Sequence, residues 1–239
     1  MRGLTAVCLA TLGIALTGCA HNSPYEPADP LERINRPIYT FNSKADEYVL
    51  RPVAVGYVKV VPQAIRTGVS NFFDNLLYPT VIVNDLLQAK FVQSGRDLGR
   101  FAMNTTFGLA GFLDPATRVG LTKNDEDLGQ TLGRWGVGSG WYLMLPLLGP
   151  STNRDLVGTV GGWWTTPTTY ADLRLEQTLA LNAANAVDKR TRLLDVDNVL
   201  KQQLDPYVFI RTAYLQQRLG AVYDGNPPSE LMEPELPED

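Results

Sequence analysis

The segment from Trp135 to Ala171 is almost free of charge, and it restricts the possible folds of this chain more than any other feature. Its only ionised side chains are Arg154 and Asp155, and seven glycines and three prolines interrupt it. A segment broken in this way cannot form one membrane-spanning helix, and it is too apolar for a solvated loop. It contains every tryptophan of the chain, at Trp135, Trp141, Trp163 and Trp164. Two interpretations stay open: the buried core of a globular domain, or an apolar surface or cavity wall that meets lipid, with the tryptophans at head-group depth.

Three glycines of this segment, Gly136, Gly138 and Gly140, stand at alternate positions. Closely spaced glycines let the backbone bend, so they indicate either the hinge of a moving loop or a set of tight turns. Both interpretations stay open. The string is not a dinucleotide-binding loop, because Trp141 stands where that motif has its third glycine.

The rest of the chain has helical periodicity. Apolar residues recur every three or four positions from Leu31 to Tyr48, which predicts an amphipathic helix with a kink at Pro37 and an end at Arg51 and Pro52. Pro79 is expected to be the first residue of a helix, and Asp205 to cap the last helix. Further helices are predicted at 63–73, 79–92, 95–106, 172–204 and from Pro206 to about Val222. Strand-like alternation is weak, so the predicted fold class is mainly α.

The supply of catalytic side chains is small. His21 is the only histidine, and the only cysteines are Cys8 and Cys19. A Ser-His-Asp triad, a Cys-His pair and a metal site built on His or Cys are therefore excluded. The acidic triplet at 125–127 favours a helix N-terminus over a cation site. We expect no cofactor, no metal and no enzymatic activity.

Acidic residues are concentrated at the C-terminal end. The formal net charge is −4, and five acids lie in the proline-rich stretch 226–239, which reads as disordered. Without this tail the chain is close to neutral, and it has no basic stripe of the kind that binds nucleic acid.

The N-terminus has the features of an export signal. A basic start and an apolar stretch precede residues 16–19 (LTGC), which resemble a bacterial lipobox. The alternative is a soluble secreted protein with a cysteine near its cleavage site. Ala20 follows the cysteine, where an aspartate would indicate retention in the inner membrane. We therefore expect a signal peptide at 1–18, an acylated tether at 19–29, a helical domain at 30–223 and a tail at 224–239, with Cys19 anchoring the protein to the periplasmic side of the outer membrane.

Many collinear strings extend across the mature chain. The sequence resembles the MlaA (VacJ) family of outer-membrane lipoproteins at 29–32 (DPLE), 35–36 (NR), 39–42 (YTFN), 51–54 (RPVA), 61–62 (VP), 70–76 (SNFFDNL), 83–88 (VNDLLQ), 100–101 (RF), 104–108 (NTTFG), 129–133 (GQTLG), 135–138 (WGVG), 145–151 (LPLLGPS), 154–155 (RD), 205–207 (DPY) and 213–214 (AY). Departures include Arg33 and Ile34, where the family more often has Gly-Phe, and Trp141, where it commonly has proline.

The resemblance implies a ring-like arrangement of amphipathic helices in the inner leaflet of the outer membrane, around an amphipathic channel. Such proteins remove mislocalised phospholipids from the outer leaflet, pass them to a soluble periplasmic lipid carrier and sit beside a trimeric porin. By resemblance, Phe41 and Asn42 shape the channel, and Gly136, Gly138 and Gly140 hinge a loop near it. The spacing of Phe41 is equally consistent with a core aromatic. Two other functions remain as alternatives: a structural lipoprotein that braces the porin, and an envelope hydrolase acting without histidine.

Overall fold

The computed structural model describes residues 29–231, so the predicted signal peptide, Cys19 and His21 lie outside the described residues. The prediction of a mainly α fold is confirmed. The elements are α2 (Glu32–Ala45), η1 (Asp46–Leu50), α3 (Arg51–Val60), α4 (Gln63–Leu87), α5 (Phe91–Thr106), α6 (Pro115–Arg118), α7 (Leu128–Arg134), β1 (Tyr142–Leu145), β2 (Gly149–Thr152), α8 (Asn153–Gly162), η2 (Trp163–Thr165), η3 (Pro167–Thr169), α9 (Leu175–Arg192), α10 (Val196–Lys201), α11 (Pro206–Val222) and η4 (Ser229–Leu231). Within 29–231, no helix combines the length and the apolar character needed to cross a bilayer.

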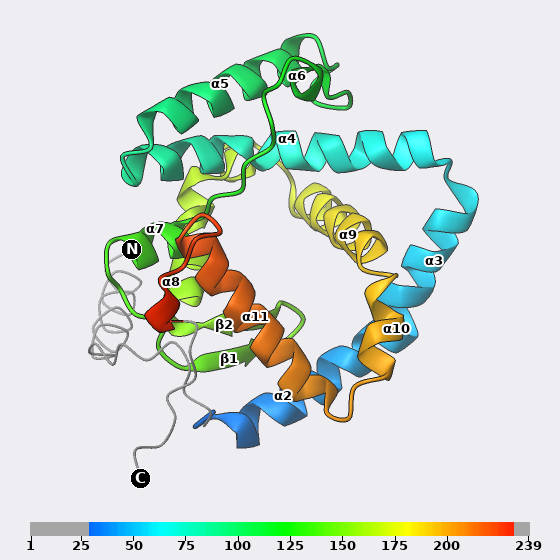
Figure 1. Ribbon diagram of the computed structural model, residues 1–239. Helices are drawn as coiled ribbons and strands as arrows, with labels where there is room; N and C mark the ends of the chain where they lie inside the picture. The colour runs from blue at the N-terminus through cyan, green and yellow to red at the C-terminus, as the bar shows by residue number, and fades with distance from the viewer. Residues whose placement is uncertain (1–28, 232–239) are drawn as a thin grey trace, which may run out of the picture.

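The first helices form the outside of the molecule. In Figure 1, α2 runs along the lower side, α3 continues on the right, and α4 crosses the upper part, where α5 packs along it. The later helices lie inside this frame: α9 contacts both α3 and α4, and α11 contacts α7, α10 and β2. Helices α7 and α8 pack against each other beside α11.

The prolines interrupt the helices less than expected. Pro37 lies inside α2, which leads through the π-helical turn η1 into α3, with Pro52 in the first turn of α3. The predicted helix end at Arg51 is therefore wrong. The π turn shifts the pattern of backbone hydrogen bonds, and Pro52 then falls in the first turn of α3. Backbone N–H groups in a first turn have no partner within the helix, so a proline without an N–H is tolerated there.

Pro79 lies in the middle of a single 25-residue helix, α4, so the predicted separate helices at 63–73 and 79–92 are wrong. Proline removes one hydrogen bond to the carbonyl of Asn75. Helix α4 packs against α5, α7 and α9 along its length, and this packing outweighs the local penalty.

The charge-poor segment contains an antiparallel hairpin, although the sequence showed little strand-like alternation. Tyr142 pairs with Thr152 and Leu145 with Gly149. Leu147 in the connecting turn has φ +62°, and Gly149 at the start of β2 has φ +85°. Strands of four residues are too short to give a clear alternation in the sequence.

The predicted helix starts at acidic residues are confirmed. Asp127 accepts a hydrogen bond from the backbone N–H of Gln130 at 2.8 Å, and this caps α7. Asp205 accepts from the N–H groups of Tyr207 and Val208 at 3.0 and 3.2 Å, and this caps α11. The single helix predicted at 172–204 is instead two, α9 and α10.

The C-terminal stretch expected to be a disordered tail is described as far as Leu231. Asp224 accepts a 2.5 Å hydrogen bond from Lys90, and the short helix η4 follows. Residues 224–231 therefore lie on the fold, contrary to the predicted boundary. For 232–239, which are outside the described residues, the prediction stays open.

Candidate functional site

The distribution of polarity in the described residues is inverted relative to a typical water-soluble domain. Sixteen polar or charged residues are buried, against nine hydrophobic ones. Thirty-three large hydrophobic side chains are exposed. Soluble proteins bury few charged residues and rarely expose extended apolar patches. Extended apolar patches are typical of surfaces that contact membranes or partner proteins. The outside of this fold is therefore suited to an apolar environment.

All four tryptophans belong to this exposed set. Trp135 and Trp141 flank the glycines and are 57% and 56% exposed, and Trp163 and Trp164 in η2 are 59% and 72% exposed. The buried-core interpretation is thus wrong for these side chains. Their contact with lipid head groups stays a prediction.

Residues 135–141, here called the glycine loop, connect α7 to β1. Gly136 and Gly140 adopt φ values of +90° and +67°, which a residue with a side chain rarely adopts. Gly138 is not among the residues with positive φ, and a Cβ there would meet no atom within 4 Å. Gly136 therefore serves the tight turn that ends α7, where its N–H donates to the carbonyl of Gly133 at 3.0 Å, and Gly140 supplies a second positive φ before β1. Whether the loop also moves as a hinge about Gly138 stays a prediction.

Phe41 and Asn42 lie on α2 beside the hairpin. The Asn42 side-chain amide donates to the Leu145 carbonyl at 2.9 Å and accepts from the Leu147 N–H at 2.8 Å, so it fixes the hairpin turn. Phe41 is 55% exposed, so the interpretation as a core aromatic is wrong. The predicted role of both residues in shaping a channel is a separate matter and stays a prediction.

Asn35, two helical turns before Asn42, is a positioning residue that sequence reasoning missed. Its buried amide donates to the Tyr142 carbonyl at 3.0 Å and accepts from the Met144 N–H at 2.9 Å. Two asparagines seven residues apart thus hold β1 along one face of α2. The spacing is visible in the sequence, but the partners are more than a hundred residues away.

An ion cluster, in which Asp155 is buried and Asp127 is half-exposed, joins α7, α8 and α11. Arg218 donates to both carboxylate oxygens of Asp127, at 2.6 and 2.9 Å, and to both of Asp155, at 3.1 and 2.8 Å. Burial acts to raise the pKa of Asp127, but the hydrogen bonds from Arg218 outweigh it and the pKa is lowered. Tyr214 donates a further 2.8 Å hydrogen bond to Asp155. Because its pKa is lowered, the carboxylate of Asp127 stays ionised at neutral pH.

A second acidic pair lies between α4 and α5. Asp85 and Asp97 are fully buried, and Asn124 donates to both, at 3.3 and 3.2 Å. Tyr78 also donates to Asp97, at 2.7 Å. Burial, and then the neighbouring Asp97, raise the pKa of Asp85 to about 8. Asp85 is therefore protonated at neutral pH.

The acidic triplet at 125–127 is distributed over separate partners. Glu126 is buried and accepts from Lys90 and Gln88, each at 2.7 Å, while Asp127 caps α7 and pairs with Arg218. Within residues 29–231, no three His, Cys, Asp or Glu side chains form a group that could hold a metal ion.

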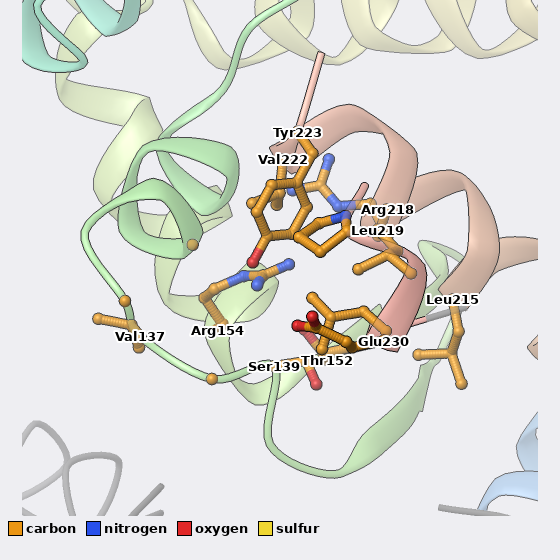
Figure 2. Close-up of a pocket in the computed structure, with 15 residues that line it drawn as sticks. Val137, Ser139, Thr152, Arg154, Leu215, Arg218, Leu219, Val222, Tyr223 and Glu230 are labelled. Atoms are coloured by element: carbon orange, nitrogen blue, oxygen red, sulfur yellow. The ribbon is translucent and has the colours of Figure 1, made fainter. Parts of the chain in front are cut away.

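A cavity of about 390 Å³ adjoins the glycine loop, the start of α8, the last turns of α11 and the segment at 228–231. Figure 2 shows the side chains of Arg154 and Glu230 extending into it from different elements. It has apolar walls from Val137, Leu215, Leu219 and Val222. The cavity therefore combines charged and apolar surface next to the glycine loop.

The family relationship agrees with the motifs and with this inverted fold. The MlaA lipoprotein family model matches residues 27–220. The chain belongs to the MlaA lipoprotein family. It is 38% identical over 227 residues to the intermembrane phospholipid transport system lipoprotein MlaA of Escherichia coli strain K12, a match that covers 90% of this chain and 86% of the relative. The MlaA protein of the same description from Haemophilus influenzae is 34% identical over 245 residues and covers 94% and 93% of the two chains.

A solved structure supports the MlaA fold independently. It comes from work on the structural basis for maintenance of bacterial outer membrane lipid asymmetry, and it is 34% identical to this chain. The superposition has a TM-score of 0.73 and covers 83% of this chain and 100% of the other. The resemblance to MlaA proteins read from the sequence is thus confirmed over nearly the whole described domain.

Proposed function

We propose that this protein is a non-enzymatic phospholipid transport component of the outer membrane. In this role it removes mislocalised phospholipids from the outer leaflet and passes them to a soluble periplasmic carrier. Three MlaA relatives of this chain are described as intermembrane phospholipid transport lipoproteins. The observation that carries the proposal is that, within residues 29–231, thirty-three large hydrophobic side chains are exposed around an interior rich in buried polar groups. Such a surface is stable in hydrocarbon, while most of the polar groups inside form hydrogen bonds with one another.

In this proposal the helices encircle an amphipathic channel and lie in the inner leaflet. The exposed tryptophans then lie at the depth of the head groups, and Phe41 and Asn42 belong to the helix that shapes the channel. The acylated Cys19 holds the protein to the periplasmic face, since several acyl chains give stable anchoring. A trimeric porin is the proposed neighbour in the membrane. No chemical step is needed, because the reaction is the transfer of an intact lipid.

The decisive experiment measures outer-leaflet phospholipid in cells that lack the protein, with and without re-expression. We expect the phospholipid content to rise on deletion and to return to normal with the wild-type protein but not with Cys19→Ala. Cys8→Ser is the matched control, because Cys8 lies within the predicted signal peptide and is absent from the mature chain. An unchanged outer leaflet after deletion contradicts the proposal and favours a structural lipoprotein that braces a porin.

The glycine loop allows a second test of the same function. Gly138→Pro restricts the backbone at the centre of the loop, whereas Gly138→Ala adds a Cβ that meets no atom within 4 Å. We expect the proline variant to accumulate normally and to clear phospholipid poorly, and the alanine variant to clear it. Equal clearance by both variants contradicts the hinge. Release of fatty acid from phospholipid by the purified protein, abolished by loss of one carboxylate, would instead support a hydrolase.

A further inference from the structure

Arg154 has hydrogen-bonding capacity that the fold does not use. Its side chain is only 8% exposed, and its Nε makes a long 3.3 Å contact with Asp155 Oδ1. Among the described residues, neither terminal nitrogen of its guanidinium has a hydrogen-bond partner. The side chain is largely buried, and its unused terminal donors open to the cavity, so this end of the guanidinium is free to receive an acceptor from a bound molecule.

The carboxylate beside Arg154 is already occupied by another residue. Both oxygens of Asp155 accept from Arg218, at 3.1 and 2.8 Å, and one also accepts from Tyr214. All three donor groups of Arg218 are engaged by Asp127 and Asp155. The charges of the two arginines and the two aspartates sum to zero. The positive charge of Arg154 is nevertheless the least compensated, because both carboxylates pair mainly with Arg218. The terminal guanidinium nitrogens of Arg154 lie in the cavity shown in Figure 2.

Helix α7 provides the space for these arginines through two glycines one turn apart. A Cβ at Gly133 would lie 2.8 Å from Arg154 Nη1, and a Cβ at Gly129 would lie 2.8 Å from Arg218 Nη2. Glycine inside a helix costs about 0.5–1 kcal/mol relative to alanine. The two glycines thus lower the stability of α7 slightly, and the space they leave lets the guanidinium of Arg154 reach the cavity.

We propose that this cavity is an anion subsite that binds the phosphate of a phospholipid head group, with Arg154 as the residue that contacts it. Guanidinium forks match phosphate oxygens, and such charge-assisted hydrogen bonds are among the strongest in proteins. Val137, Leu219 and Val222 supply apolar wall for the adjoining part of a lipid, which an inorganic ion would not use. This subsite rests on the proposed transport of phospholipid and places a head group beside the glycine loop.

Glu230 supplies an opposing charge. It is exposed and belongs to the wall of the same cavity, yet no ion pair joins it to Arg154 within the described part of the chain. A carboxylate in the wall repels an incoming phosphate. Its removal should therefore tighten binding, and a gain of affinity cannot result from partial unfolding of the variant.

The test is binding of dihexanoyl phosphatidylglycerol, kept below its micelle concentration, to the full-length protein in an uncharged maltoside detergent, measured by calorimetric titration. We expect Arg154→Gln to weaken binding roughly 10- to 100-fold. We expect Glu230→Gln to tighten it roughly two- to fivefold. Arg134→Gln is the matched control, because Arg134 is an exposed arginine at the end of α7 outside the cavity wall. Arg154→Lys should recover only part of the affinity, since lysine keeps the charge and loses the fork.

Inorganic phosphate forms the second arm of the titration. Binding of the lipid that depends on Arg154, with much weaker binding of phosphate, supports the lipid subsite. Equal, Arg154-dependent binding of both overturns the lipid assignment in favour of a free-phosphate site. Equal lipid binding by the wild type and Arg154→Gln overturns the subsite altogether. Failure of the transport function is recognised separately, because an unchanged outer leaflet in the deletion strain does not depend on this titration.

Discussion

Gly158 in α8 has no room for a side chain against α7, and this close contact gives a sharp prediction. A Cβ at Gly158 would lie 2.4 Å from the backbone nitrogen of Gly129 and 2.7 Å from its Cα, where ordinary contact begins at 3.4 Å. The Gly158→Ala contact with the nitrogen is therefore short by 1.0 Å. Both partners are backbone atoms, so the helices must separate, and this disturbs the pairing of Arg218 with Asp127 and Asp155.

Overpacking of this kind costs about 1–3 kcal/mol. Alanine recovers about 0.5–1 kcal/mol, because glycine is the poorer helix former. We therefore expect Gly158→Ala to destabilise the protein by up to about 2.5 kcal/mol and to lower Tm by up to roughly 10 °C. The measurement is thermal unfolding of the detergent-solubilised protein, followed by far-ultraviolet circular dichroism.

Gly162, four residues later in the same helix, is the matched control. A Cβ there would meet no atom within 4 Å, so Gly162→Ala should keep the helix-propensity gain and raise Tm by roughly 1–4 °C. An equal rise in Tm for Gly158→Ala and Gly162→Ala refutes the argument that the α7–α8 contact excludes a side chain.

Three further predictions concern single polar side chains. Asp85 keeps its proton in the folded state up to about pH 8, so wild-type stability should fall as pH rises from about 4 to about 8 and then level off. Asp85→Asn should remove this fall and gain on the order of 5 kcal/mol at pH 8, measured by denaturant titration. Asn42→Ala should cost about 1 kcal/mol and speed hydrogen exchange at the Leu147 amide, because the hairpin turn loses both bonds to Asn42. Asp205→Ala should cost about 1–2 kcal/mol in the same denaturant titration, since α11 loses its cap.

Each of these predictions has a control at a chemically similar position. Asp125→Asn changes an exposed carboxylate and should leave the pH profile of stability as in the wild type. Ser43→Ala, next to Asn42 on α2, should leave exchange at Leu147 unchanged. Asp195 precedes α10 without a side-chain cap bond, so Asp195→Ala should cost less than Asp205→Ala. Identical effects of a variant and its control would contradict the corresponding argument.

Local sequence signals predicted the features that depend on neighbouring residues. Asp205 followed by Pro206 marks the start of α11, and Asp127 caps α7, because a cap needs only the next three residues. The mainly α class follows from helical periodicity in the same way. The motifs at 29–42 and 129–138 also pointed to the family that the comparison confirms.

Features that depend on distant partners were not predictable from the sequence. Pro79 favours a helix start locally, but packing of α4 against several helices keeps one continuous helix through it. The four-residue strands form because Asn35 and Asn42 hold β1 from more than a hundred residues away. The apolar segment fitted both core and surface, because periodicity does not show on which side of the fold an apolar stretch lies.

The polar interior has a consequence for how the protein responds to temperature. Exposure of apolar groups on unfolding raises the heat capacity, and exposure of polar groups lowers it. Here the described interior is dominated by amides and ion pairs, and many large apolar side chains are already at the surface. The heat-capacity change of unfolding should therefore be small for a chain of this size, so its stability curve is broad and changes little on cooling. The composition of the surrounding bilayer or detergent then becomes the stronger influence on how firmly the fold is held.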